Sequence, residues 1–290
     1  MATQHEQDAM RLAIALSARG VGTTSPNPPV GCVILDADGE IAGTGYHERK
    51  GSPHAEAYAL EAAGGRARGG TAVVTLEPCN HIGRTPACRQ ALLDAKISRV
   101  VIAHIDPTSR GEGGAAVLRA ADLHVEVGVL ADEARLVLGN WLDSQAKRRP
   151  IVTAAYAHTR HGPSHLDQPQ LTALRGAFDA VLLDGARLEE GTPDSHGAGS
   201  FELPVHLPHG EPTQQLRSLF EGGARTLLLV DAAGLPSGWN GIVDRLLIYV
   251  APNAPAISDS HPAQLVPQGF RLKNVSVETR LVRIECISVR

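Results

Sequence analysis

The sequence has few cysteines, no excess of basic residues and no long apolar run. Its four cysteines (Cys32, Cys79, Cys88 and Cys286) are too few for a disulfide framework in 290 residues, which favours a reducing compartment. The formal net charge of −4 gives no reason to expect a broad surface for nucleic acid or for membranes. A few local Arg or Lys residues could still bind a small anionic substrate.

No segment has the pattern of a secretory signal or of a membrane span. The first eight residues are polar, and no window approaches 18 uninterrupted apolar residues. We therefore expect a cytoplasmic protein with neither a membrane nor a nucleic-acid partner. What the sequence does contain, 43% hydrophobic and 20% charged residues, is typical of a globular protein, and its length suits one large domain or two.

The first half of the chain alternates between strand-like and helix-like segments. Helices are predicted over residues 8–20, 54–63, 87–95, 115–121 and 131–147, and strands over 30–35, 41–46, 71–76, 99–105 and 124–129. This alternation predicts an α/β fold, with a three-layer α/β/α domain around a mixed sheet over residues 1–147.

The composition changes near Arg148-Arg149-Pro150. Strands are predicted after it over residues 151–156, 180–183, 226–231, 245–250 and near 281–288, and helices over 170–178 and 213–221. Residues 189–212 are rich in Gly, Pro, His and Ser, which predicts a long loop. We therefore expect a second, smaller α/β domain over residues 148–290.

Two short segments contain the residues that a catalytic zinc site needs. The first is His54-Ala55-Glu56, and the second runs from Pro78-Cys79 to Cys88. One imidazole and two thiolates suit zinc, which in catalytic sites keeps three protein ligands and one open position. Zinc activates water at neutral pH, and a nearby carboxylate can transfer protons. We predict His54, Cys79 and Cys88 as metal ligands and Glu56 as the catalytic residue.

Each of these residues also has a simpler interpretation. A lone cysteine is most often a small buried hydrophobic residue, which is the role we assign to Cys32 and Cys286. A structural zinc site would need a fourth protein ligand, for which His81 could be proposed. The joint pattern, with His and Glu opening a helix and Pro-Cys following a strand, favours the catalytic site.

The His-x-Glu and Pro-Cys…Cys pattern resembles the zinc signature of nucleobase deaminases, in which a short C-x-x-C is common. Here the eight residues Asn-His-Ile-Gly-Arg-Thr-Pro-Ala separate the two cysteines. Together with Pro-Asn-Pro-Pro-Val-Gly at 26–31 and Gly-Thr-Gly-Tyr-His at 43–47, this loop resembles the deaminase domain of the riboflavin-biosynthesis deaminase/reductases. The resemblance covers residues 8–147.

The resemblance implies a cytidine-deaminase-like fold and a phosphoribosylaminopyrimidine substrate. The implied reaction is hydrolytic removal of the 2-amino group of 2,5-diamino-6-ribosylamino-4(3H)-pyrimidinone 5′-phosphate. Asn27, His47, His81 and Arg84 are the substrate contacts that it implies. One position departs from the family pattern, because Asp106-Pro107-Thr108 stands where the family has Asp-Pro-Asn.

The same resemblance implies a dihydrofolate-reductase-like second domain that uses NADPH, and here the functional segments are poorer. The family's Ser-Leu-Asp-Gly segment is His-Thr-Arg-His-Gly at 158–162, and its Glu-Gly-Gly is Asp-Ala-Ala-Gly at 231–234. Two alanines where glycines would approach a pyrophosphate weaken NADPH binding. We expect a degenerate, shortened reductase domain without cofactor-binding residues, which packs against the deaminase domain or forms a homodimer.

Three functions follow as alternatives. The first is a zinc-dependent deaminase of riboflavin biosynthesis with a vestigial second domain. The second is a bifunctional deaminase and NADPH-dependent 5-amino-6-(5-phosphoribosylamino)uracil reductase. The third is a non-catalytic zinc-binding partner protein or a deaminase of a related aminopyrimidine. Glu56 argues against a non-catalytic partner, because a scaffold needs no group for proton transfer.

Overall fold

The computed structural model describes residues 1–80, 87–109, 111–159, 161–196, 203–204, 207, 210–230, 238–239, 241–251, 265–278 and 281–289. Contacts within the chain divide it into two compact units. Unit 1 consists of Met1–Ala146 and Ser195–Ser200, and unit 2 of Lys147–Asp194 and Phe201–Arg290. The chain therefore leaves unit 2 once, for a short segment that belongs to unit 1.

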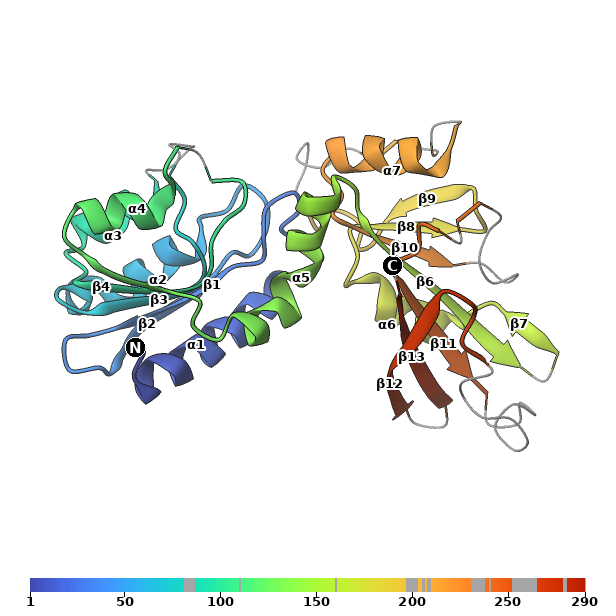
Figure 1. Cartoon of the computed structure of the whole chain (residues 1–290), viewed down its shortest axis with the longest axis horizontal. Helices are drawn as coiled ribbons and strands as arrows, with labels where there is room; N and C mark the ends of the chain where they lie inside the picture. The colour runs from blue at the N-terminus through green and yellow to red at the C-terminus, as the bar shows by residue number, and fades with distance from the viewer. Residues whose placement is uncertain are drawn as a thin grey trace. The chain divides into compact units, whose positions relative to one another are not determined.

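Unit 1 is a mixed five-stranded sheet between two layers of helices (Figure 1). The strand order is β2-β1-β3-β4-β5, with β1 antiparallel to β2 and β3, and β3, β4 and β5 parallel. Its elements are α1 (Gln4–Ser17), η1 (Ala18–Gly20), β1 (Gly31–Leu35), β2 (Ile41–Tyr46), α2 (Ala55–Ala63), η2 (Gly64–Ala67), β3 (Thr71–Leu76), α3 (Cys88–Asp94), β4 (Arg99–His104), α4 (Gly113–Ala120), β5 (His124–Val127) and α5 (Ala131–Lys147).

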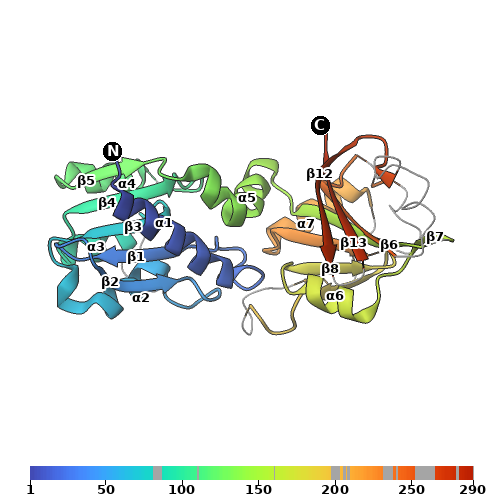
Figure 2. The ribbon, with the colours of Figure 1, turned by 90° about the horizontal axis from the view of Figure 1, so that it is seen from below.

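Alternation along the strands builds two cores, one on each face of the sheet. In β1, Cys32 and Ile34 pack with α2, α3 and α4, whereas Val33 and Leu35 pack with α1 and α5. Successive strand residues point to opposite faces, so a strand buried on both sides needs apolar residues at every position. This arrangement is the predicted three-layer α/β/α fold, seen from the α1 side in Figure 2.

Helix α1 begins four residues before the predicted start at Asp8. Thr3 caps it: the Thr3 hydroxyl accepts a hydrogen bond from the Glu6 N–H, and the Glu6 carboxylate accepts one from the Thr3 N–H. This reciprocal capping box satisfies two backbone donors that the first turn leaves open. The sequence Thr-Gln-His-Glu, with its acidic residue three positions after the cap, is the signature of this motif.

Unit 2 is built on an eight-stranded sheet with the order β12-β13-β11-β6-β10-β8-β9, to which β7 adds by pairing with β6. Strands β11, β6, β10 and β8 are parallel, and the outer strands pair antiparallel. Its elements are β6 (Ile151–Thr159), β7 (Gly162–Ser164), α6 (Gln168–Arg175), β8 (Ala180–Leu183), β9 (Arg187–Glu190), α7 (Pro212–Glu221), β10 (Thr226–Val230), β11 (Arg245–Val250), β12 (Phe270–Glu278) and β13 (Leu281–Ser288).

Two helices cover opposite faces of this sheet. Leu216 and Leu219 of α7 belong to one core, whereas Leu171 of α6 belongs to the other. Cys286 is fully buried in the α7 core, as Cys32 is in unit 1. Both cysteines therefore have the packing role expected of them.

Two carboxylates, the buried Asp179 and the partly buried Asp244, join the starts of the parallel strands in unit 2. Asp244, just before β11, accepts hydrogen bonds from Arg149 at 2.7 and 2.8 Å and from the backbone N–H of Val152 at 2.9 Å. Asp179, just before β8, accepts hydrogen bonds from the backbone N–H groups of Arg225 and Thr226. Each carboxylate therefore links two neighbouring strands where they begin.

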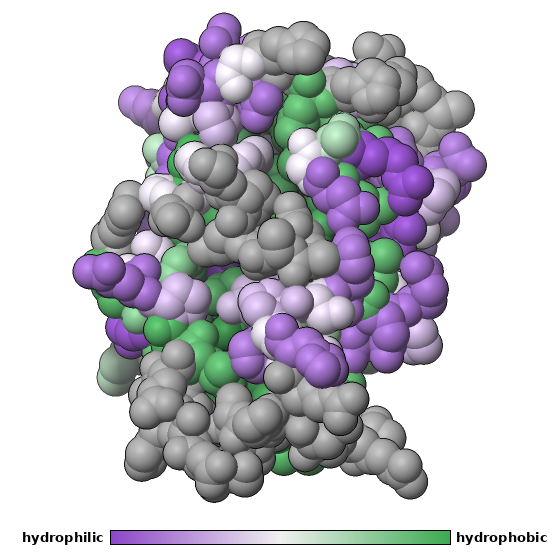
Figure 3. Space-filling view, turned by 90° about the vertical axis from the view of Figure 1, so that its right-hand side faces the viewer, coloured by the Kyte–Doolittle hydropathy of each residue, from purple (hydrophilic) through white to green (hydrophobic). Residues whose placement is uncertain are grey.

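The structure adds strands that sequence patterns did not predict. Strand β9 takes the first residues of the predicted loop over 189–212, and β12 pairs with the predicted strand β13 to close one edge of the sheet. Hydrophobic areas reach the surface among hydrophilic ones on the face shown in Figure 3. In the part of the chain that the structure describes, no helix is long and apolar enough to cross a membrane.

Candidate active site

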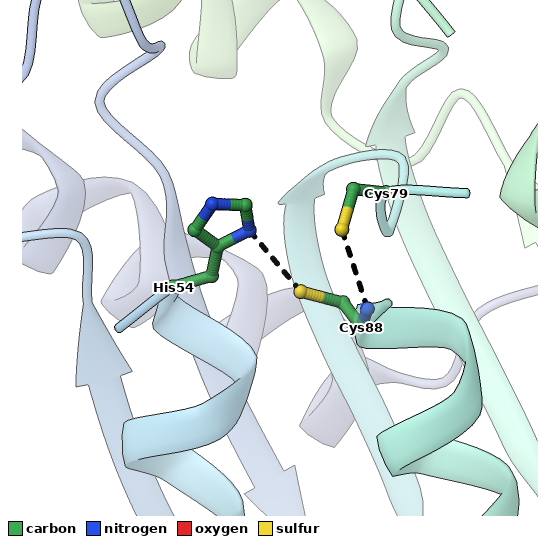
Figure 4. A group of neighbouring side chains, drawn as sticks. All are labelled: His54, Cys79 and Cys88. Atoms are coloured by element: carbon green, nitrogen blue, oxygen red, sulfur yellow. Dashed lines mark hydrogen bonds between the residues drawn. The ribbon is translucent and has the colours of Figure 1, made fainter. Parts of the chain in front are cut away.

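The structure brings His54, Cys79 and Cys88 together (Figure 4). Their ligand atoms all lie within 4.8 Å of one another. His54 Nδ1 is 3.2 Å from Cys88 Sγ, and the backbone N–H of Cys88 donates to Cys79 Sγ at 3.2 Å. Within the described residues, this is the group of His, Cys, Asp or Glu side chains whose geometry suits a metal ion.

Two helix N-termini and one strand end position these three residues. His54 is the N-cap of α2, and Cys88 is the first residue of α3. Cys79 comes three residues after the end of β3. Free backbone N–H groups at a helix start carry partial positive charge, which stabilises thiolates nearby. The local fold therefore supplies a site that favours negatively charged sulfur.

Glycines in β2 allow the start of α2 to lie directly against the sheet. A Cβ atom on Gly45 would come within 2.4 Å of the Ala55 carbonyl oxygen, and one on Gly43 within 2.2 Å of the Ala59 carbonyl oxygen. Any side chain at either position would push the helix away. The two glycines of the Gly-Thr-Gly-Tyr-His motif thus position His54 and Glu56 through backbone contact. This packing role explains the glycines without any part in the chemistry.

The two thiols differ in how readily they ionise. The hydrogen bond with Cys88 is the main cause that lowers the pKa of Cys79 to about 4, with further help from His54. The same contact with Cys79, together with burial, raises the pKa of Cys88 well above its ordinary value. The hydrogen bond between the two sulfurs therefore favours the thiolate form of Cys79.

The donor set fits zinc. Tetrahedral zinc with bonds of about 2.0–2.3 Å requires ligand atoms roughly 3.3–3.8 Å apart. The three donors, all within 4.8 Å of one another, are close to that spacing. Two sulfurs and one imidazole nitrogen are the soft-to-borderline ligands that zinc accepts, whereas magnesium and calcium prefer oxygen. Three protein ligands leave a fourth position open, as a catalytic site requires.

Glu56 lies on the first turn of α2 and is 3% exposed. Burial raises the pKa of its carboxyl group, and the charge of His54 opposes that effect. The carboxylate also interacts with the Cys88 side chain, so it belongs to the same cluster as the three ligands. A buried carboxyl beside a metal site is well placed to accept and donate protons.

Asn27 and His47 lie beside the metal-ligand group. The Nδ2 atom of Asn27 is 3.2 Å from His47 Nε2, and the His47 ring meets the His54 ring edge-on with centroids 5.3 Å apart. His47 is 3% exposed, and burial lowers its pKa against the opposing hydrogen bond to the Pro53 carbonyl. The remaining two residues that the resemblance implies, His81 and Arg84, lie outside the described residues.

Glu77 is a further buried residue, which sequence patterns do not single out. Its carboxylate accepts hydrogen bonds from the backbone N–H of Ala115 at 2.8 Å and of Asp106 at 3.2 Å. It therefore joins the loop after β4 to the segment that carries Cys79, beside a cavity of about 250 Å³. The hydroxyl of Thr108 on that loop donates to Asp106, at the position where the family has Asn.

All of these groups lie at the same end of the sheet, where strands β2, β3 and β4 finish. His47, Cys79 and Asp106 follow the carboxyl ends of β2, β3 and β4, which run in the same direction. Open α/β sheets place their ligands outside the carboxyl ends of the strands. The topology thus brings together residues from three separate segments of the chain.

The same region of the chain matches known proteins. Residues 3–104 match the family model described as the cytidine and deoxycytidylate deaminase zinc-binding region. The chain is 35% identical over 288 residues to the riboflavin biosynthesis protein RibD of Corynebacterium ammoniagenes, covering 85% of this chain and 86% of that protein. The chain belongs to the RibD family.

Two further relatives show how the likeness is distributed. A diaminohydroxyphosphoribosylamino-pyrimidine deaminase of Buchnera aphidicola is 50% identical over 127 residues, which cover 43% of this chain and 86% of that protein. The solved structure of Acinetobacter baumannii RibD superposes with a TM-score of 0.75 at 27% identity, covering 99% of both chains. The RibD fold therefore extends over both units, including the second.

Proposed function

We propose that the protein is a zinc-dependent deaminase of riboflavin biosynthesis, acting on 2,5-diamino-6-ribosylamino-4(3H)-pyrimidinone 5′-phosphate. The observation that carries this proposal is the convergence of His54, Cys79 and Cys88 beside the buried Glu56. The deaminase of Buchnera aphidicola, 50% identical over 127 residues, supports the substrate class.

In this proposal His54, Cys79 and Cys88 hold the zinc ion. Bound zinc supplies Lewis acidity that activates water for attack on a ring carbon at neutral pH. The protein has two further tasks, proton transfer and substrate orientation, and both fall to residues near the same cluster.

Glu56 transfers the protons. A carboxylate oxygen of Glu56 accepts a proton from the attacking water and then delivers it to the departing amine, which leaves as ammonia. Its burial excludes bulk water from the carboxyl group, so the proton stays available for the second transfer. One C–N bond breaks, and the water oxygen becomes the carbonyl oxygen of the product. One water proton leaves with ammonia, and the other remains on a ring nitrogen.

Asn27 and His47 orient the aminopyrimidine, and His81 and Arg84 contact the base or the phosphoribosyl part. Arg84 offers a guanidinium group for the phosphate, a pairing that is strong and directional. We further propose a cytoplasmic location, where the four thiols remain reduced.

We propose that residues 1–147 form the deaminase domain and that residues 148–290 form a degenerate reductase-like domain. The altered segment at 231–234 lies outside the described residues, so this proposal rests on its sequence. A separate Glu-Gly-Gly at 221–223 ends α7 and precedes β10, at the end of the sheet opposite the carboxyl ends of the parallel strands. Its two glycines therefore form a structural turn between α7 and β10. We also propose that unit 2 supplies the contact surface of a homodimer.

A bifunctional deaminase and NADPH-dependent reductase is the second candidate. The specific observation in its favour is that the likeness to Acinetobacter baumannii RibD covers 99% of both chains. A functional second site would need a glycine-rich loop that binds the NADPH pyrophosphate, and the alanines at 232 and 233 weaken that binding.

The test is ammonia release from the diaminopyrimidine phosphate by the full chain in oxygen-labelled water. We expect zinc-dependent ammonia release and one labelled oxygen in the product. A zinc-loaded protein that releases no ammonia from this substrate would overturn the proposal. Release from a related aminopyrimidine alone would replace the substrate but keep the chemistry.

A further inference from the structure

The turn that carries Asn27 is held by a residue far away in the chain. Asn27 donates its backbone N–H to the Thr24 carbonyl at 2.9 Å, which closes the turn. The indole Nε1–H of Trp141 in α5 donates to the Pro26 carbonyl at 2.9 Å. Trp141 is 4% exposed, so this bond lies in a protected environment where a lost partner is costly.

The same turn is held from the other side by His47, and the chemistry of the partners determines its tautomer. The Pro53 carbonyl oxygen, 3.0 Å from His47 Nδ1, can only accept, so Nδ1 carries the hydrogen. Nε2 of the neutral ring is then an acceptor. Asn27 must therefore turn its NH₂ group toward Nε2, 3.2 Å away.

This arrangement determines what Asn27 presents to a ligand. One N–H of the NH₂ group bonds to His47, and this bond fixes the carboxamide so that its oxygen points away from His47 and can accept from another partner. Asn27 is partly buried, and its partner His47 is in edge-on contact with the metal-ligand residue His54, so the carboxamide lies one residue away from the metal-ligand group. An acceptor at this place pairs with a ring N–H or an amino group of a ligand.

We propose that Trp141 is a positioning residue for substrate, acting with His47 to hold Asn27 so that its carboxamide oxygen accepts a hydrogen bond from an N–H group of the base. His47 then acts through Asn27, because both of its ring nitrogens bond within the protein. This inference rests on the proposed function and deepens it, since an aminopyrimidine offers the N–H donors that the oxygen requires.

Trp141→Phe isolates the indole N–H, because phenylalanine keeps an aromatic ring in the core. We expect KM for the diaminopyrimidine phosphate to rise about tenfold, the equivalent of about 1.4 kcal/mol, with kcat and zinc content unchanged. Trp239→Phe is the matched control: Trp239 is the second tryptophan of the chain, is 6% exposed in the unit 2 core, and should leave KM unchanged.

A double-mutant cycle distinguishes positioning from general stabilisation. If Trp141 acts through Asn27, then Trp141→Phe should raise KM in the wild-type background and have no further effect in Asn27→Ala. Independent effects that multiply in the double variant would overturn the inference. So would a Trp141→Phe protein that loses zinc or kcat, because that outcome assigns the indole to stability alone.

The controls also separate this inference from the proposed function. A wild-type protein that holds zinc but releases no ammonia refutes the function, and the inference falls with it. An active wild type whose KM is indifferent to Trp141→Phe refutes the inference alone.

Discussion

Glu56 of unit 1 and the two aspartates of unit 2 lie at opposite ends of the strands in their sheets, and their neighbours separate a chemical from a structural role. In unit 2, Asp179 and Asp244 lie at the starts of parallel strands, and backbone N–H groups and Arg149 occupy their oxygens. In unit 1, Glu56 lies near the carboxyl ends of the strands, among the metal-ligand residues. Glu77, buried after the end of β3 in unit 1, is likewise held by backbone N–H groups. Neither burial nor the end of the sheet therefore marks a site by itself; the neighbouring metal-ligand residues do.

Removing a metal-ligand thiol from unit 1 should have the largest effect on zinc content and activity, and it tests most directly whether the chemistry belongs to unit 1. Cys79→Ala should reduce bound zinc from one per chain to near zero and remove ammonia release, because two remaining ligands hold zinc poorly. Metal analysis of the purified protein measures it. Cys286→Ala, buried in unit 2, is the matched control and should keep full zinc. Equal zinc in both variants would contradict the ligand assignment.

Removing the proton-transfer group is the next largest perturbation. Glu56→Gln should lower kcat by about 10²- to 10⁴-fold while zinc remains bound, since general acid–base catalysis contributes on that scale. Glu61→Gln, on the exposed side of the same helix, should retain wild-type kcat. Retained ammonia release in Glu56→Gln would mean that another group moves the proton.

The third perturbation tests the structural carboxylate of unit 2. Asp244→Asn should lower the free energy of unfolding of unit 2 by about 2–3 kcal/mol, because hydrogen bonds from charged donors weaken. Urea unfolding followed by Trp239 fluorescence, in a Trp141→Phe background, reports on that unit. Glu221→Gln removes an exposed pair with Arg217 and should change stability little. Deaminase kcat should be unaffected by either variant.

The same carboxylate predicts a pH dependence. Burial acts to raise the pKa of Asp244, but hydrogen bonds from Arg149, Lys147 and Val152 outweigh it and hold the pKa below its ordinary value. A carboxyl with a lowered folded-state pKa stabilises the fold above its unfolded-state pKa and loses that contribution as pH falls through the folded-state value. Wild-type unit 2 should therefore lose stability below about pH 4, and Asp244→Asn should lack this component.

Most of the fold of unit 1 follows from sequence patterns. Helix α5 and strands β2 and β3 have the predicted bounds, because apolar periodicity and flanking turns agree there. Strand β12 escaped detection for a physical reason: its register shifts between Leu272 and Asn274, so the alternation of apolar residues is interrupted. Strand β9, Arg-Leu-Glu-Glu, buries only Leu188 and carries too little apolar signal.

The residues of the candidate site also fall into two groups, those that local motifs predict and those that only the structure reveals. Local motifs are enough to predict His54, Glu56, Cys79 and Cys88 as a group, since the chemistry of zinc restricts its ligands. The bonds of Glu77 to Ala115 and of Trp141 to Pro26 connect positions 38 and 115 apart, and no local pattern announces them. Sequence patterns therefore identify the chemically distinctive residues and miss those that hold them in place.

The comparison of the two units leads to one central proposal: unit 1 catalyses the deamination, and unit 2 catalyses no reduction. One reaction of the zinc-loaded full chain with the diaminopyrimidine phosphate, in which ammonia release and NADPH oxidation are followed together, tests it. We predict stoichiometric ammonia, a deaminated product that accumulates, and no NADPH consumed. NADPH oxidation that keeps pace with ammonia release would contradict the proposal and establish the bifunctional enzyme.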